Sequence, residues 1–289
     1  VHQPGEFTDA EILHALNKAD TYLCKKVMGQ DEQFFEETDQ TLGFIADQRE
    51  YAFGTVHGGR IFKITAIERT DVNDGVFMDF LQNFQDMKQY DKVDSSIAET
   101  PYRNHFYIRG MNIGILPTPG TTVATNMKLY YNVLPAKMHV GKPKTGTQAQ
   151  SATNTLILND SPLIGRLIRR ITDYYRGAVI EITSGKGIGQ IRTISAYDRS
   201  TQVATMSSAW DTDNAPNSES IYEILPQLME QYEEVLELRA VLSLLSKDES
   251  TTAYKLFSGL YTEQYNDLLE TIRDRQVSEP RRVRFIPDE

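Results

Sequence analysis

Apolar residues recur at helical spacing near both ends of this chain and at shorter, strand-like spacing through its middle. The N-terminal stripe follows three- and four-residue steps through Ile12, Leu16, Ala19, Leu23 and Val27. Such steps place side chains on one face of a helix. Thr8 precedes the stripe and Glu11 follows three residues later, which is the pattern of a capping box. The sequence therefore predicts a helix that begins after Thr8 and ends near Gly29.

Two more helices are predicted in the last quarter of the chain, separated by a polar link at 246–248. The first stripe holds Leu228, Tyr232, Val235, Leu236, Leu238, Leu242 and Leu245, and the second holds Tyr254, Phe257, Leu260, Tyr261, Tyr265, Leu268, Leu269 and Ile272. A short link between two amphipathic helices predicts an antiparallel hairpin. Because neither end of the chain can bury its apolar stripe alone, we expect the N-terminal helix to pack on this hairpin.

Strands and one helix are predicted between these two ends. Residues 61–67 are predicted to form a strand, and a helix is predicted from the spacing of Phe77, Phe80, Leu81, Phe84 and Met87. Between 105 and 133 the apolar period changes to two and a turn falls at 117–120, so we expect an antiparallel meander. Residues 141–151 have no apolar periodicity and are predicted to be a linker or an exposed loop.

A compact all-β module is predicted from 151 to 224. Short β-type runs at 179–182, 190–194, 202–206 and 221–224 are separated by turns rich in Gly, Asp, Ser and Asn. The approach to these runs, 161–174, fits either a helix with a proline in its first turn or a loop with anchored apolar side chains. The segment Gly185-Lys186-Gly187-Ile188-Gly189 has the glycine content of a phosphate-binding loop, but a strand follows it, so a turn between antiparallel strands is favoured.

The predicted fold class is α+β, a helical bundle with antiparallel strands and an inserted small all-β domain. The bundle is expected to be discontinuous, at 1–150 and 225–275, and the inserted module spans 151–224. Residues 276–289 contain Pro280 and Pro287 and are predicted to be an extended C-terminal tail.

Charge and cysteine content argue against several classes of function. Forty acidic and thirty basic residues among 289 give a net charge of −10, which would repel a polyanion, so sequence-specific DNA binding is not expected. No apolar run approaches the roughly 18–20 residues of a membrane-spanning helix, and no membrane partner is expected. The single cysteine, Cys24, permits no intrachain disulfide, and residues 1–6 do not resemble a signal peptide, so we expect synthesis in a reducing cytoplasm.

No catalytic constellation is recognisable, and no cofactor or metal is predicted. The histidines lack the three- or four-residue spacing of a zinc site on a helix: they are His2, His14, His57, His105 and His139. Cys24 lies among apolar positions, which is typical of a core cysteine and not of a nucleophile. Adjacent carboxylates such as Glu36-Glu37 and Glu233-Glu234 are typical of a solvated helix face, and a glycosidase pair cannot be identified from sequence separation.

Charged residues are unevenly distributed along the chain. Residues 225–275 hold ten acidic and five basic side chains, whereas basic residues cluster ahead of the β runs and in the tail, at Arg166, Arg169, Arg170, Arg176, Arg281, Arg282 and Arg284. These complementary segments are either solvated or in contact with another subunit or a partner. Tyr254, Tyr261 and Tyr265, near one helix stripe, are typical of core or subunit contacts.

Two stretches of the sequence resemble structural proteins of tailed bacteriophages. The capped helix from Thr8, Phe34-Phe35, the segment Asp47-Gln48-Arg49-Glu50-Tyr51-Ala52-Phe53 and the strand set from Tyr107 to Pro135 resemble head–tail adaptor, or head-completion, proteins. The second stretch resembles a β-module that recurs in phage virion proteins, and it comprises Tyr174-Tyr175-Arg176-Gly177, Ile182 to Ile194, Tyr197-Asp198, Val203-Ala204-Thr205, Ala209-Trp210 and Ser220 to Ile224.

The resemblance implies a non-enzymatic virion structural protein of the neck, between capsid and tail, with no cofactor. Such adaptors commonly form a ring of about twelve copies under the portal protein. They line the channel through which genomic DNA passes without sequence-specific binding, and they contact tail or neck proteins or fibres. Their C-terminal segment often enters the portal or a neighbouring subunit, which makes Arg281, Arg282, Arg284 and Phe285 candidate contacts. The acidic face of Glu230, Glu233, Glu234 and Glu237 is the candidate lumen or subunit boundary.

Two alternative functions stay open on the sequence. A neck, tail or fibre-attachment protein would use the β-module to bind another structural protein of the virion. A carbohydrate-active virion enzyme would need a deep groove with exposed aromatic side chains, whereas the single tryptophan, Trp210, occupies a position that suits the core of the β-module.

Overall fold

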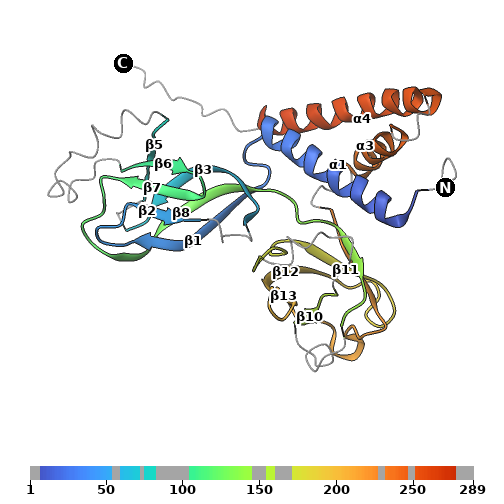
Figure 1. The fold of residues 1–289 in the computed structure, drawn as a ribbon, viewed down its shortest axis with the longest axis horizontal. Coiled ribbons are helices and arrows are strands. Elements are labelled where there is room, and N and C mark those ends of the chain that lie inside the picture. The colour runs from blue at the N-terminus through green and yellow to red at the C-terminus, as the bar shows by residue number, and fades with distance from the viewer. Residues whose placement is uncertain are drawn as a thin grey trace, which may run out of the picture. The chain divides into compact units, whose positions relative to one another are not determined.

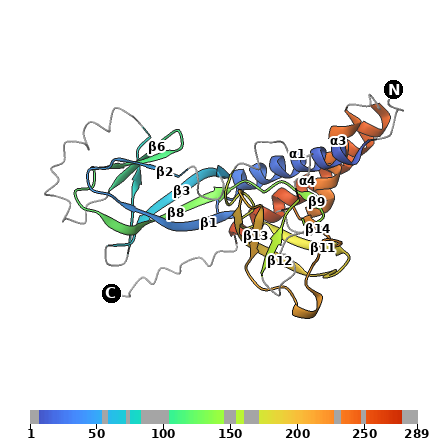
Figure 2. The same ribbon diagram turned by 60° about the horizontal axis from the view of Figure 1, so that its bottom comes forward.

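Helices and strands occupy different parts of the chain (Figure 1). The computed structural model describes residues 7–53, 59–71, 75–82, 104–144, 154–159, 171–226, 232–246 and 251–277. The chain forms two compact units, one from Val1–Phe34 with Leu228–Glu289 and one from Phe35–Gln227. The first unit is helical and is built from both ends of the chain, whereas the second contains all the described strands (Figure 2).

The helical unit contains three helices among the described residues: α1 (Asp9–Gln30), α3 (Glu233–Leu245) and α4 (Thr251–Val277). The predicted capping box begins α1, because the Glu11 amide donates to Thr8 Oγ1 at 3.3 Å and the Thr8 amide donates to Glu11 Oε2 at 3.2 Å. α3 contacts both other helices, and α1 also contacts α4. The prediction that the N-terminal helix packs on two C-terminal helices is therefore confirmed, although their link at 247–250 lies outside the described residues.

Two sheets of the β unit share one hydrophobic core. The first has the order β1-β8-β3-β4 and is formed by Glu36–Phe44, Val123–Val133, Ile61–Arg69 and Val76–Phe77. The second has the order β2-β7-β6-β5 and is formed by Glu50–Ala52, Asn112–Leu116, His105–Arg109 and Asp79–Phe80. The side chains packed between them include Phe44, Tyr51, Ile67, Phe106, Ile113, Met127 and Leu129.

The third sheet has the order β10-β13-β12-β11-β14-β9, and all its strand pairs are antiparallel. Its strands are Thr155–Ile157, Val203–Met206, Ile191–Asp198, Val179–Ser184, Ile221–Ile224 and His139–Gly141. The four predicted β-type runs thus correspond to β11, β12, β13 and β14. Trp210 is 3 % exposed in the core of this sheet and donates from Nε1 to the Thr155 carbonyl at 3.3 Å, which confirms its prediction as a core residue.

The glycine-rich segment at 185–189 is a turn between β11 and β12, as predicted, and no helix follows it. Gly185, Gly187 and Gly189 all have positive φ, a conformation that strains residues with a Cβ. The turn is held by residues ahead of β14: Ser220 Oγ donates to the Lys186 carbonyl at 2.6 Å, and the Gly187 amide donates to Asn214 Oδ1 at 3.1 Å. Its backbone groups are therefore engaged with the protein itself.

The predicted fold class is wrong, because the protein is mostly β. The described residues form fourteen strands in three sheets and three α-helices, and they do not form a helical bundle with a small inserted β domain. Local apolar spacing predicts element types but not which distant strands pair, and the first sheet depends on such pairing. In that sheet β8 is the partner of both β1 and β3.

Two local predictions between 77 and 133 are also wrong. Phe77 lies in β4 and Phe80 in β5, both about half exposed, in place of the predicted helix, whose remaining positions at 84 and 87 lie outside the described residues. Residues 105–116 form the β6-β7 hairpin, but β8 pairs in the other sheet, so the segment is not a meander. Of the open stretch at 161–174, residues 171–174 form a bend and turns, and 161–170 lie outside the described residues, as does the predicted linker beyond 144.

A buried arginine joins the first sheet to the third within the β unit. The Arg60 side chain donates from Nη1 to the Leu134 carbonyl, just after β8, at 2.7 Å, and from Nη2 to the Arg176 carbonyl, ahead of β11, at 2.5 Å. Its guanidinium also lies 5.6 Å from the ring centroid of Tyr174. Arg60 is 7 % exposed, and removal of its side chain would take the guanidinium donor from two part-buried carbonyl groups.

We expect Arg60→Ala to lower the free energy of unfolding of the β unit by about 3 kcal/mol, because two part-buried carbonyls lose charge-assisted hydrogen bonds. Urea unfolding followed by the fluorescence of Trp210, the single tryptophan, measures this unit selectively. Arg109→Ala is the control, since that side chain is 67 % exposed and pairs with Glu50 at 3.5 Å on the surface. Equal losses in the two variants would contradict the role of Arg60.

Candidate functional site

The helical unit presents an acidic face on α3. Glu233, Glu234 and Glu237 are all exposed, whereas the neighbouring Val235 and Leu236 are buried against the rest of the unit. Glu233 and Glu237 are one helical turn apart, so their carboxylates lie on the same side of the helix. None of the three forms an ion pair with another described residue, so within the described part of the chain their negative charge has no cationic partner. The fourth predicted member, Glu230, lies outside the described residues.

The candidate contact residues of the tail are not placed by the structure. Arg281, Arg282, Arg284 and Phe285 all lie outside the described residues. The same holds for Arg166, Arg169 and Arg170 of the predicted basic cluster. Its fourth member, Arg176, lies in the β unit and forms an ion pair with buried Asp39 at 3.8 Å.

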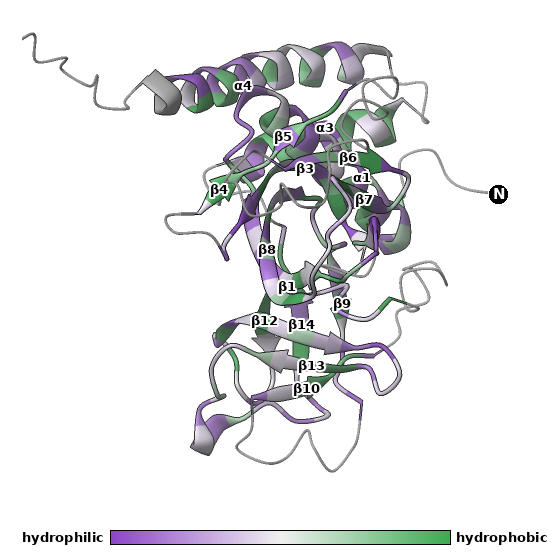
Figure 3. Ribbon diagram, turned by 90° about the vertical axis from the view of Figure 1, so that its left-hand side faces the viewer, coloured by the Kyte–Doolittle hydropathy of each residue, from purple (hydrophilic) through white to green (hydrophobic). Residues whose placement is uncertain are grey.

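α4 buries little of its length within the helical unit. Among its side chains that the structure describes, Leu268 and Ile272 are buried, while Leu256 is 64 % and Leu260 is 45 % exposed. Hydrophobic and hydrophilic residues are interleaved along the helix (Figure 3). Leu256 and Leu260 are four residues apart and form an exposed apolar stripe on the first half of α4. Such a stripe gains free energy when another surface covers it.

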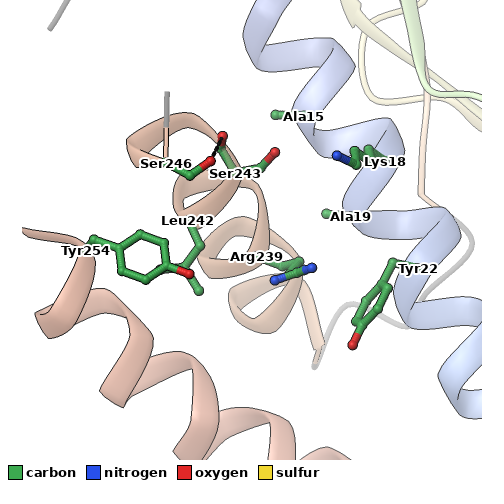
Figure 4. Close-up of a pocket in the computed structure, with 9 residues that line it drawn as sticks. All are labelled: Ala15, Lys18, Ala19, Tyr22, Arg239, Leu242, Ser243, Ser246 and Tyr254. Atoms are coloured by element: carbon green, nitrogen blue, oxygen red, sulfur yellow. Dashed lines mark hydrogen bonds between the residues drawn. The ribbon is translucent and has the colours of Figure 1, made fainter. Parts of the chain in front are cut away.

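A pocket of about 230 Å³ lies among the three helices (Figure 4). α1 contributes Ala15, Lys18, Ala19 and Tyr22, α3 with the residue after it contributes Arg239, Leu242, Ser243 and Ser246, and α4 contributes Tyr254. Lys18 points from α1 toward α3 (Figure 4). The pocket thus combines two cationic groups and four hydroxyl groups with an apolar floor.

Tyrosine rings hold the Arg239 guanidinium in this pocket. Its central carbon lies 4.5 Å from the ring centroid of Tyr22 and 5.6 Å from that of Tyr261, both within reach of a cation–π interaction. Tyr261 in turn stacks on Tyr265 with ring centroids 5.5 Å apart. Burial raises the pKa of Tyr261 to about 12, so its hydroxyl stays neutral at physiological pH. Tyr261 and Tyr265 are half-buried within the unit, and Tyr254 is 40 % exposed.

The lone cysteine is a core residue, as predicted. Cys24 is fully buried in α1 and its Sγ lies 3.6 Å from Oδ1 of Asp20, one turn earlier on the same helix. Burial raises the pKa of the Cys24 thiol, and the nearby Asp20 carboxylate raises it further, so the reactive thiolate is disfavoured. Burial also raises the pKa of Asp20, to about 7.

The sequence did not point to the residues that line the pocket. Lys18, Tyr22 and Arg239 belong to helix faces that the periodicity assigns to solvent or to packing, and more than 200 positions separate the α1 residues from Arg239. No short motif links them. A pattern confined to one helix could not have found a site that three helices build together.

Among the described residues there is no cluster of three or more His, Cys, Asp or Glu side chains that could hold a metal ion. No helix in the described part of the chain has the length and apolar character needed to cross a membrane. Comparison of the sequence with models of protein families and with curated proteins gives no match either.

The buried Asp20 predicts that the helical unit loses stability as the pH rises. Its folded-state pKa of about 7 lies above the value of about 3.9 expected in the unfolded chain, so the folded state keeps a proton that the unfolded state has lost. The contribution of this proton is complete below about pH 4 and is lost as the pH rises toward 7. Between pH 5 and pH 8 the loss amounts to about 3 kcal/mol.

Asp20→Asn is expected to remove most of this pH dependence. Urea unfolding at pH 5 and pH 8, followed by circular dichroism at 222 nm, reports mainly on the three helices. Asp267→Asn on α4 is the control, because that side chain is exposed and its change should leave the pH profile as in the wild type. A wild-type profile in Asp20→Asn would show that Asp20 does not carry the effect.

Proposed function

We propose that this protein is a non-enzymatic structural subunit of a tailed-phage virion, a head–tail connector that forms a ring between the portal and the tail. The observation that carries the proposal is the helical unit, which exposes an apolar stripe on α4 and an acidic face on α3. Both surfaces favour contact with further protein chains. The resemblance of the sequence to head–tail adaptor proteins is the reason for proposing a ring under the portal.

The exposed stripe on α4 favours a partner that covers it. A helix of 27 residues gains most of its stability from packing, and few of the described α4 side chains are buried by α1 and α3. Covering Leu256 and Leu260 would remove apolar surface from water at about 25 cal/mol per Å². In a ring, each copy offers two different surfaces to its two neighbours. A single copy with one uncovered helix face is consistent with that arrangement.

The acidic face of α3 suits the boundary of a channel for DNA. A wall that carries Glu233, Glu234 and Glu237 offers no cations to replace the counterions of a nucleic acid, so DNA would pass without being held. The same face would equally suit a contact with a basic surface of a neighbouring copy. In this proposal the tail residues Arg281, Arg282, Arg284 and Phe285 contact the portal.

Native mass spectrometry of the protein alone and with its cognate portal ring tests this function directly. We expect about twelve copies to bind one portal ring, since a connector must match the symmetry of the ring it meets. The protein alone can remain monomeric, because many assemblies form only on their partner. A trimer or hexamer that does not bind the portal would overturn the connector role and favour a tail or fibre protein.

The double variant Leu256→Ser, Leu260→Ser is expected to keep the fold and to reduce the number of copies on the portal ring. Both side chains are exposed, so their change removes contact surface and no core packing. Thr252→Ser, Lys255→Ser alters exposed residues of the same helix and serves as the control. Circular dichroism checks that both variants fold, and an unchanged copy number in the leucine variant would show that the stripe is not a contact.

A further inference from the structure

The pocket of the helical unit holds two cations without acidic partners. Neither Lys18 nor Arg239 forms an ion pair or a hydrogen bond with another described residue. The guanidinium of Arg239 is instead held through its face, over the rings of Tyr22 and Tyr261. Its N–H donors lie in the plane of the group and remain available at its edge. In a chain with ten more acidic than basic residues, such unpaired cations mark a site for an anion.

A second polar group next to this pocket also lacks a partner. The hydroxyl oxygen of Tyr261 is buried and makes no hydrogen bond within the described part of the chain. The ring of Tyr261 lies against the Arg239 guanidinium, with its centroid 5.6 Å from the central carbon. Buried polar groups in proteins are usually hydrogen-bonded, and an unsatisfied one needs an explanation. This hydroxyl is enclosed by protein and Tyr261 does not line the pocket, so the charged groups open to a ligand are those of Lys18 and Arg239.

The lining of the pocket favours a carboxylate carried on an apolar stem. Lys18 and Arg239 supply positive charge, whereas Ala15, Ala19 and Leu242 form an apolar floor. A glutamate side chain has both parts, because its methylene groups can contact the alanines and the leucine while its carboxylate meets the cations. A free phosphate would be fully hydrophilic and would leave the apolar floor uncovered. The volume of about 230 Å³ is sufficient for one such side chain.

We propose that this pocket receives a glutamate carboxylate of a second copy of this chain, supplied by Glu233, Glu234 or Glu237 of α3. The two surfaces are complementary in charge, because among the described residues the helical unit exposes unpaired carboxylates on one side of α3 and unpaired cations on the other. The proposal rests on the proposed function only in assuming that copies of the chain meet. The pocket residue Arg239 is the centre of the contact.

The two surfaces cannot pair within a single copy. Arg239 follows Glu237 by two residues, which turns the helix by about 200°, so the pocket and the acidic face lie on opposite sides of α3. A carboxylate from one copy therefore fits the pocket of the next, and that copy presents its own acidic face to a third. Such a head-to-tail contact generates a closed ring or an open chain, according to the angle between neighbours.

Complementary variants test this contact without any other protein. The pocket variant is Lys18→Glu, Arg239→Gln, and the face variant is Glu233→Lys, Glu234→Lys, Glu237→Lys. We expect the wild type to self-associate in sedimentation velocity at low salt and to dissociate as salt rises. Each variant alone should associate at least about tenfold more weakly. An equimolar mixture should form dimers, because one intact pocket then meets one intact face.

Three further variants distinguish the loss of this contact from a loss of fold or a general change of charge. Arg239→Gln removes a cation–π contact, so Lys18→Glu alone, at an exposed position, must show the same direction of effect while circular dichroism shows an intact fold. Lys255→Glu and Glu263→Lys change exposed charges on α4 that do not line the pocket and should associate as the wild type does.

Three results of the association experiments would overturn the proposal. They are a wild type that stays monomeric at the highest attainable concentration, association that neither variant weakens, and a variant mixture that forms no dimer. Inorganic phosphate or free glutamate that binds the wild type but not Lys18→Glu, with self-association unchanged, would assign the pocket to a small anion and would also overturn it. Binding of the pocket variant to the portal ring at the normal copy number would leave the connector role standing and remove only this contact.

Discussion

The packing of α1 against α3 is the contact on which the helical unit depends. It joins two helices separated by roughly 200 positions, and helices of this kind gain most of their stability from tertiary packing. Leu23, Cys24 and Val27 of α1 are fully or almost fully buried, as are Val235 and Leu236 of α3. The helical unit therefore exists only when both ends of the chain are present together. All the described strands are confined to the intervening unit.

The β unit contains sheets that do not all share one hydrophobic core, and polar contacts join them. The first two sheets share one cluster of apolar side chains, but the third has a cluster of its own. Arg60 reaches from the start of β3 to carbonyls that belong to both parts. A guanidinium suits this role because its donors point in fixed directions and can serve two acceptors at once. Burial of the charge makes the contact costly to break.

The sequence predicted individual helices and strands well where a short stretch of residues determines the type of element. Thr8 with Glu11 identified the start of α1, and alternation with turn residues identified β11 to β14. The fold class was wrong because the first sheet is built by pairing distant strands, and β8 supplies edges to β1 and β3 that no local pattern reveals. The helical spacing at Phe77 and Phe80 was misleading, since a short apolar run fits a helix and a strand equally well. These residues form strands because β4 pairs with β3 and β5 pairs with β6.

The pocket could not be predicted either, because residues that lie far apart in the sequence form it. Its side chains indicate what it could bind. Lys18 alone is an ordinary exposed lysine, and Arg239 alone is an ordinary arginine on an amphipathic helix. The tertiary structure brings both side chains to one pocket. It also places tyrosine rings against Arg239, where a carboxylate would usually be found. Rings hold a guanidinium in place without neutralising it, so its charge remains available. Acidic side chains are abundant in this chain, yet none pairs with these two cations among the described residues. A surface arranged in this way is complementary to the acidic face that the same unit exposes on its other side.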